Sequence, residues 1–485
     1  MSWLVESSKT SIVCYFLGYA LYNVFFHPLR KYPGPKLWSI SRIPYSLCYM
    51  SGKAHKRILE LHEEYGDIVR IAPNELIFCY PEAFNDIPGH REQGEEEIGK
   101  DQGFWKEDSI TLTGSNGQDH RRVRRILSHA FSAKAMADQE PLIKRYVELL
   151  IEKLKIAVAE DKSQEMTSWY NWTTDIIGDL AYADPFGCLE TSSYHPWVKL
   201  IFKHIKGLAI NNSVAKFPFA QSLLKMMMPK EVAKDIRAHH EFNQAKVAKR
   251  LALKEPRPDF MQSMITAQEN NLISHEEIVA NSHLLIVGGS ETTATVFSGA
   301  TYLLASHKAV REKLYQEIKT RFANQDEIDL LSVQKLDYMM AVLKEVMRIY
   351  PAVPSAIPHI TPPRGTMIRE EFVPGNTVLG IWPWPMFHHP KHFAEPEPFA
   401  PERWLGDHKF EEDKRIALQP FSVGARDCIG KNLAYAEMRL ILAKMVWNFD
   451  MKLDSRSENW LEKNVLSFLW DKPPLYIRLT PRNMS

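Results

Sequence analysis

The sequence predicts a mainly α-helical protein with a small β region, and three observations support this prediction. Apolar residues recur at helical spacing from about residue 118 to residue 347. Strand-like stretches are short and lie at residues 68–78, 351–401 and 465–479. Strands and helices do not alternate regularly, which argues against a doubly wound parallel sheet.

Composition and charge set broad limits. The 485 residues carry a net charge of +1, which gives no indication of a nucleic-acid partner, and the hydrophobic content of 45% is ordinary for a globular protein. The five cysteines are scattered without a C-x-x-C pair, which is typical of a reducing compartment. No repeat or low-complexity linker interrupts residues 31–485, so we expect one domain there.

The N-terminal segment SIVCYFLGYALYNVFF, residues 11–26, contains no charged side chain. It is short for a membrane span, and Leu4 and Val5 extend it. Basic residues follow it, which by the positive-inside rule places the rest of the chain in the cytoplasm. A cleaved signal peptide is the alternative, but no small-residue cleavage site is present. We expect residues 1–30 to form a membrane anchor and residues 32–35, YPGP, to form a stiff hinge.

Local patterns predict the elements of the body in order. Residues 68–78, IVRIAPNELIF, predict two short strands around a Pro-Asn turn. Helices follow to residue 347, and the Pro-rich region 351–401 is strand-like. A strong helix is expected after Cys428, and the tail 465–479 is expected to be extended.

The loop FSVGARDCIG, from Phe421 to Gly430, matches the pattern F-x-x-G-x-R-x-C-x-G. A chance match in a chain of this length has odds on the order of one in ten thousand. A helix that starts just after Cys428 would favour a thiolate through its dipole and free N–H groups. Arg426 offers a fork of donors to a carboxylate, and Gly424 permits close approach of a flat group. These residues indicate a cysteine that ligates haem iron, with Arg426 on a haem propionate; a buried free cysteine is the alternative.

The segment GGSETT, residues 288–293, lies within a long predicted helix. Two adjacent glycines cost about 1 kcal/mol each relative to alanine, so we expect a helix that is locally opened where a ligand approaches. The Thr292 hydroxyl can bond a carbonyl one turn back or a ligand, and Glu291 can relay protons. The alternative is a glycine contact between helices with polar residues facing solvent.

Glu345 and Arg348 share one face of a predicted helix, because they are three residues apart. Arg403, in the segment PERW, lies far along the chain. If it docks on Glu345, the three residues form a buried structural lock, which we expect to stabilise the fold without acting in catalysis.

The charge run DHRRVRR supplies further candidates. His120 and Arg124 share a face that suits an anion, and Arg121 and Arg125 share an adjacent face. His359 is another candidate donor. A solvated charge run and a structural histidine are the alternatives.

In this order, these residues resemble the cytochrome P-450 superfamily of haem-thiolate monooxygenases over nearly the whole chain. The segment FFHPLRKYPGP, residues 25–35, resembles the filamentous-fungal branch. GGSETT and DIPGHR, residues 86–91, resemble members of secondary metabolism, including trichothecene-type hydroxylases. The resemblance implies the cytochrome P-450 fold preceded by an N-terminal transmembrane helix. It also implies a single-pass protein of the endoplasmic reticulum membrane with a cytoplasmic haem-thiolate catalytic domain.

The resemblance further implies a role for each candidate residue. Cys428 would be the thiolate ligand of haem b iron, and Thr292 with Glu291 would deliver protons to bound dioxygen. The remaining cofactor-binding residues would be Arg426, His120, Arg124 and His359 on the propionates, with Phe421 and Gly430 in the haem loop. His120 stands where many members have Trp and His359 where many have Arg, which makes the grip on the propionates more sensitive to pH. Gly288 replaces a commoner Ala and would widen the groove over the iron.

The implied activity is hydroxylation or epoxidation of a lipophilic terpenoid or polyketide intermediate in fungal secondary metabolism. The sequence has no nucleotide-binding fingerprint, so electrons would come from NADPH-cytochrome P-450 reductase, with cytochrome b5 as a second candidate donor. Arg121, Arg122 and Arg125 would form the docking patch. Substrate contacts would come from the loop before Asp119 and from residues 205–228, 284–288, 353–357 and 466–468.

Two alternatives remain open at this stage. The same haem could serve desaturation, ring formation or oxidative coupling. A non-catalytic haem electron-transfer protein is more remote, because a pure electron carrier needs no proton relay such as Thr292.

Overall fold

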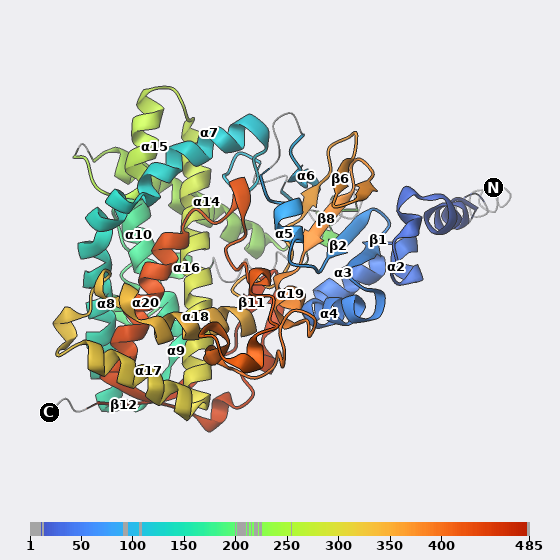
Figure 1. Cartoon of the computed structure of the whole chain (residues 1–485). Helices are drawn as coiled ribbons and strands as arrows, with labels where there is room; N and C mark the ends of the chain where they lie inside the picture. Colours follow the sequence, from blue (N-terminus) through green and yellow to red (C-terminus); the bar gives the residue numbers. More distant parts are fainter. Residues whose placement is uncertain are drawn as a thin grey trace.

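The computed structural model describes residues 11, 14–90, 96–105, 109–198, 200, 210, 213–214, 216–217, 222, 226–253 and 255–482. Figure 1 shows long helices gathered around α16 (His275–Ser306), with several strands and short helices on the side of the N-terminus and β12 beside the C-terminus. The prediction of a mainly α protein with a small β region is confirmed.

The other α-helices of the described residues lie in this chain order: α2 (Lys36–Ile40), α3 (Ile43–Met50), α4 (Ala54–Tyr65), α5 (Ala83–Asp86), α6 (Gln102–Trp105), α7 (Gly117–Ser128), α8 (Ala133–Glu160), α9 (Met166–Trp172), α10 (Thr174–Tyr182), α11 (Cys188–Thr191), α14 (Lys230–Leu251), α15 (Phe260–Glu269), α17 (Lys308–Arg321), α18 (Asp337–Ile349), α19 (Pro383–His388) and α20 (Lys431–Asn448).

The strands of the described residues form four small sheets. The largest has the order β1-β2-β8-β5-β3, in which only β2 and β8 are parallel; the others are β4-β12-β9, β6-β7 and β10-β11. Their bounds are β1 (Ile68–Ala72), β2 (Glu75–Phe78), β3 (Gly99–Lys100), β4 (Ser163–Glu165), β5 (His359–Ile360), β6 (Thr366–Ile368), β7 (Glu371–Val373), β8 (Val378–Ile381), β9 (Phe449–Leu453), β10 (Val465–Ser467), β11 (Leu469–Asp471) and β12 (Tyr476–Pro481).

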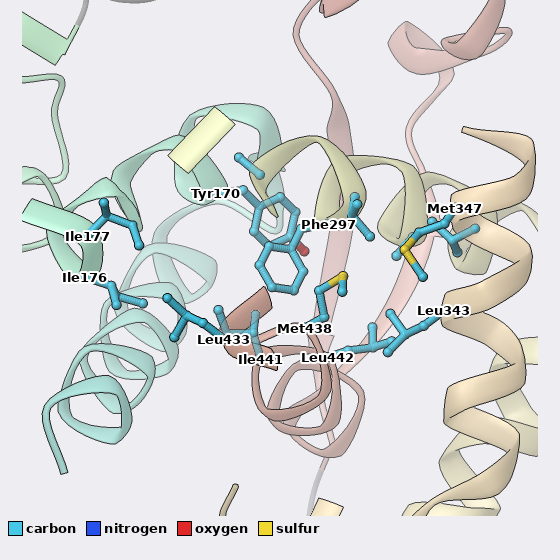
Figure 2. Close-up of a cluster of buried hydrophobic side chains, with 14 of the residues drawn as sticks. Tyr170, Ile176, Ile177, Phe297, Leu343, Met347, Leu433, Met438, Ile441 and Leu442 are labelled. Atoms are coloured by element: carbon cyan, nitrogen blue, oxygen red, sulfur yellow. The ribbon is translucent and has the colours of Figure 1, made fainter. Parts of the chain in front are cut away.

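Helix α16 is the centre of the helical body, where it contacts α9, α10, α14, α18 and α20. In Figure 2, Tyr170, Ile177, Phe297, Leu343 and Met438 meet in one apolar cluster drawn from five helices. All five are nearly fully buried, so each contributes about 1.5–3 kcal/mol of hydrophobic stabilisation, Tyr170 less because of its hydroxyl. This packing fixes the position of α16 and therefore of the GGSETT segment.

Most predicted elements form where the sequence places them. β1 and β2 pair antiparallel around Pro73-Asn74, α20 follows the cysteine loop, and β10 to β12 make up the tail. The prediction of a locally opened helix at residues 288–293 is wrong, because α16 stays α-helical throughout. The presence of its two adjacent glycines is explained instead by what surrounds each of them.

The N-terminal region was expected to contain a membrane-spanning helix, and residues 1–10 and 12–13 lie outside the described residues. No helix in the part of the chain that the structure describes is long and apolar enough to cross a membrane. The YPGP segment is also a fixed contact and not a hinge. Arg70 N donates to Pro33 O at 2.8 Å, and a Cβ at Gly34 would collide with the backbone of Arg70.

Candidate active site

The loop before α20 presents Cys428. Cys428 N donates to Phe421 O at 2.9 Å, and the Phe421 ring packs on Tyr435 of α20, with centroids 5.0 Å apart. Gly424 has a φ of +80°, and a Cβ there would collide with the carbonyl oxygen of Pro88. The loop is therefore held at both ends, and its conformation depends on glycine.

Cys428 is accessible although protein surrounds it. Burial raises the pKa of its thiol, and the Gly430 N–H opposes this shift. A Cβ at Gly430 would lie 4.0 Å from the Cys428 Sγ, so this glycine leaves room next to the sulfur. An accessible thiol at the N-terminus of a helix suits a ligand to a soft or borderline metal centre.

Arg426 lies in a socket of polar groups. Its Nε donates to Glu97 Oε1 at 2.8 Å, and its two terminal nitrogens donate to Ser115 O at 2.9 Å and to Asn116 Oδ1 at 3.0 Å. The Arg426 side chain is 4% exposed, whereas Glu97 is 35% exposed. Arg426 is therefore fixed in place, while its carboxylate partner lies closer to solvent.

Four further basic residues surround Arg426, and together the five form what we call the cationic cluster: Lys100, His120, Arg124, His359 and Arg426. The pairing of β3 with β5 sets Lys100 opposite His359, and Lys100 Nζ lies 3.3 Å from His359 Nε2.

The electrostatics of the cationic cluster are those of an excess of positive charge. Burial, and then the Arg426 charge, lower the pKa of Lys100 to about 7 and that of His120 to about 4. Burial and the neighbouring Lys100 hold the pKa of His359 well below its usual range. No described carboxylate forms an ion pair with Lys100, so the donors of this cluster suit an added anion.

Two members of the cationic cluster differ from what the sequence indicated. Arg124 is already engaged, because it donates to Asp427 O at 2.7 Å and forms an ion pair with the Asp427 carboxylate. Lys100 was not predicted at all. It stands alone in the sequence IGKD, and only the long-range pairing of β3 with β5 brings it to His359.

Helix α16 gives its adjacent glycines opposite surroundings. A Cβ at Gly289 would lie 2.8 Å from the Ile177 side chain of α10, whereas a Cβ at Gly288 would meet nothing within 4 Å. Thr292 Oγ1 donates to Gly288 O at 2.6 Å. The Gly288 and Thr292 face of α16 therefore borders open space, and Gly289 serves helix packing.

Glu291, the residue before Thr292, is buried beside this face of α16. Its carboxylate forms an ion pair with Lys472, which also donates to Thr295 Oγ1 at 2.8 Å. Burial raises the pKa of Glu291 and Lys472 opposes the shift. Sequence reasoning missed Lys472, which follows β11 and has no local pattern that marks it.

The three residues of the expected structural lock meet in the interior. Arg348 donates to Glu345 through Nε at 3.0 Å and Nη2 at 2.8 Å, and Arg403 Nε lies 3.4 Å from Glu345 Oε1. Their side chains are 0% exposed. Arg403 also pairs with Asp413, and Trp404 Nε1 donates to Glu345 at 2.9 Å.

The basic patch is smaller than the sequence indicated. Arg122 contacts Glu277 at 2.5 Å and Asp119 at 3.1 Å, so it ties α7 to the start of α16. Arg121 and Arg125 remain, and they border a surface hollow together with His120, Arg124, Ser128 and Ala425.

The segments expected to contact substrate are only partly described, because most of residues 205–228 lie outside the described residues. Phe468, with the unusual φ of +84°, packs against Phe104 with ring centroids 5.7 Å apart. Ser355 Oγ donates to Phe468 O at 2.6 Å. This turn joins β10 to β11 and brings an aromatic ring next to α6.

Comparison with known proteins agrees with this geometry. The cytochrome P450 family model matches residues 32–479. The trichothecene C-15 hydroxylase of Fusarium sporotrichioides is 42% identical over 99% of this chain and 98% of its own. The averantin hydroxylase of Dothistroma septosporum is 39% identical over 98% and 91%, and the cytochrome P450 monooxygenase astA of Talaromyces wortmannii is 42% identical over 95% and 94%. The chain therefore belongs to the cytochrome P450 family of monooxygenases, oxidoreductases that use molecular oxygen.

Proposed function

We propose that the chain inserts one atom of dioxygen into a lipophilic intermediate of fungal secondary metabolism, of terpenoid or polyketide type, by hydroxylation or epoxidation. The observation that carries this proposal is the accessible Cys428 thiol at the start of α20 beside a cluster of buried cations. The relatives named above include hydroxylases of such metabolites.

The residues present fit haem b in a single catalytic domain, residues 31–485. Cys428 would ligate the iron, and the loop from Phe421 to Gly430 would face the ring. The cationic cluster would hold the propionates. Arg124 is bound to Asp427 and Arg426 to Glu97, so Lys100 is the one lysine or arginine of the cluster with no ion pair among the described residues. When bound, a haem with a thiolate ligand supplies the chemistry that cleaves dioxygen.

The protein's own contribution lies on α16. Thr292 would hold a proton at Oγ1 on the open face, and Glu291 on the adjacent flank would supply protons from the interior. Gly288 leaves space on that face for a bulky substrate. Apolar and aromatic side chains, among them Phe104 and Phe468, would exclude water from it.

Electrons would reach the haem from NADPH-cytochrome P450 reductase or cytochrome b5. Arg121 and Arg125 support a docking face, since they border a surface hollow that also reaches the haem-loop residue Ala425. If reversing both charges left the rate of reduction unchanged, this docking face would be abandoned. Charge reversal at Arg122 is not a suitable test, because it would break the tie to Glu277.

We also propose attachment to the endoplasmic reticulum membrane through residues 1–30. Large apolar side chains stand exposed on this part of the chain, including Tyr15, Phe16, Leu17 and Phe26. Deletion of residues 1–30 should release the protein from microsomal membranes. Retention after this deletion would mean that other surfaces carry the attachment.

The central experiment is reduction of the purified protein under carbon monoxide. Thiolate ligation predicts a strongly red-shifted Soret band, which Cys428→Ala should abolish and Cys48→Ala should keep. A band typical of histidine ligation in the unchanged protein would overturn the proposal. With a metabolite in hand, label from ¹⁸O₂ in the product supports oxygen insertion, and its absence supports desaturation, ring formation or coupling.

A further inference from the structure

Glu291 and Lys472 form a buried ion pair next to the Gly288 and Thr292 face of α16. Their side chains are 3% and 4% exposed, and Lys472 Nζ also reaches Thr295 Oγ1 one turn further along α16. A buried ion pair of this kind loses hydration on both partners, so packing alone gives no reason to keep it. Its place, one residue from Thr292, suggests a role in the reaction.

Among the described residues, hydrogen bonds reach one of the two carboxylate oxygens of Glu291 and leave the other without a partner. Oε1 accepts from Lys472, whereas Oε2 is buried and has no hydrogen-bond partner among the described residues. A buried carboxylate oxygen without a donor is costly unless water or a transferable proton reaches it. Oε2 is therefore the atom at which Glu291 can exchange protons.

Lys472 stands on a rigid part of the chain. The neighbouring backbone is held by Trp470 Nε1, which donates to Pro351 O at 2.8 Å, and by Pro473 O, which accepts from Trp460 Nε1 at 2.8 Å. Leu475 N donates to Glu165 at 2.9 Å. The backbone around Lys472 is thus held independently of α16, and its ammonium can hold the Glu291 side chain in one orientation.

We propose that Lys472 is a positioning residue for proton supply: it holds Glu291 as a carboxylate by its Oε1 and leaves Oε2 free to pass protons toward Thr292. This inference rests on the proposed function. Among the described residues, the other ionisable groups that interact with Glu291 include Asp471, Tyr194 and Tyr350. None of these three groups carries a positive charge. Removal of Lys472 should therefore convert Glu291 to the neutral acid.

The first test reads the protonation state of Glu291 without any turnover. The infrared spectrum of the haem-loaded Lys472→Met protein at pH 7, minus that of the unchanged protein, should show a new band from a protonated carboxyl group. The band should be absent from Lys472→Met/Glu291→Gln and from Lys472→Arg. The buried acid Glu437, whose pKa is raised to about 8, contributes equally to both spectra and cancels.

The second test measures how NADPH is spent when a reductase supplies electrons. Lys472→Met should raise the fraction of NADPH electrons released as hydrogen peroxide by about tenfold, and Lys472→Arg should restore most of the coupling. Lys463→Met, at an exposed position, is the matched control. Unchanged peroxide release and no new carboxyl band in a folded Lys472→Met protein would overturn the inference. If the unchanged protein, reduced under carbon monoxide, showed no Soret band typical of thiolate ligation, the proposed function would be overturned instead.

Discussion

The structural lock and the cationic cluster both gather buried basic residues, yet they balance charge in opposite ways. In the lock, Arg348 and Arg403 face Glu345 and Asp413, and each guanidinium also donates to backbone carbonyls. In the cationic cluster, the two arginines pair with Asp427 and Glu97. Lys100 and the two histidines have no carboxylate partner among the described residues, and their pKa values are lowered. A fully paired network indicates a structural role, and buried basic groups without an acidic partner indicate a site that can bind an added anion.

The strongest test of the structural role of the lock is to remove Arg403. Arg403→Ala leaves the buried carboxylate of Asp413 without its arginine and removes one of the two arginines on Glu345, so the free energy of unfolding should fall by about 3–5 kcal/mol. Urea unfolding of the haem-bound protein measures it. The control is Lys313→Ala, which removes an exposed pair with Glu402 and should cost about 1 kcal/mol or less. Equal losses in the two variants would show that the lock is no more than a surface-type pair.

Acid should affect the lock region through His388, which stacks on Trp384 near Arg348. Burial and then Arg348 lower its pKa from 6.5 to about 3. Between these values the unfolded chain binds a proton that the folded protein does not, so stability falls as the pH drops below about 6.5. We expect a loss of about 3 kcal/mol by pH 4. His388→Gln should flatten this slope in thermal unfolding, and an unchanged slope would contradict the assignment.

In the cationic cluster, Arg426→Ala should act on the cofactor more than on the fold. Loss of charged hydrogen bonds to a propionate predicts haem release that is roughly tenfold to a hundredfold faster, measured by transfer to apomyoglobin. Arg426→Lys keeps the positive charge but loses the paired N–H donors of the guanidinium. Its rate of haem release should therefore lie between those of the unchanged protein and Arg426→Ala. If Arg426→Ala unfolded the protein while haem transfer stayed unchanged, Arg426 would belong with the lock.

Lys100→Met gives the smallest and most discriminating effect. It removes a buried amine that has no ion pair with any described residue, so stability should not fall, while haem transfer should speed up about tenfold. A lower melting temperature with unchanged haem transfer would mean that Lys100 is structural.

How much the sequence predicts depends on the range of the interaction. The strands around Pro73-Asn74, the helix after Cys428 and the meeting of Glu345 with Arg348 follow from local patterns. Lys100 and Lys472 could not be predicted, because strand pairing and the chain path after β11 bring them to partners 259 and 181 residues away. Arg122 was misjudged for the same reason, since its partner Glu277 lies on another helix.

The two adjacent glycines of α16 have a consequence for engineering. Replacing Gly289 by a larger residue would push α10 away from α16, so variants there would mostly report damaged packing. Replacing Gly288 would instead grow a side chain into the open space beside Thr292. Alanine, valine and leucine at Gly288 would thus reduce this space in steps. Comparing the three variants would show how large a molecule the enzyme accepts, with the rest of the protein unchanged.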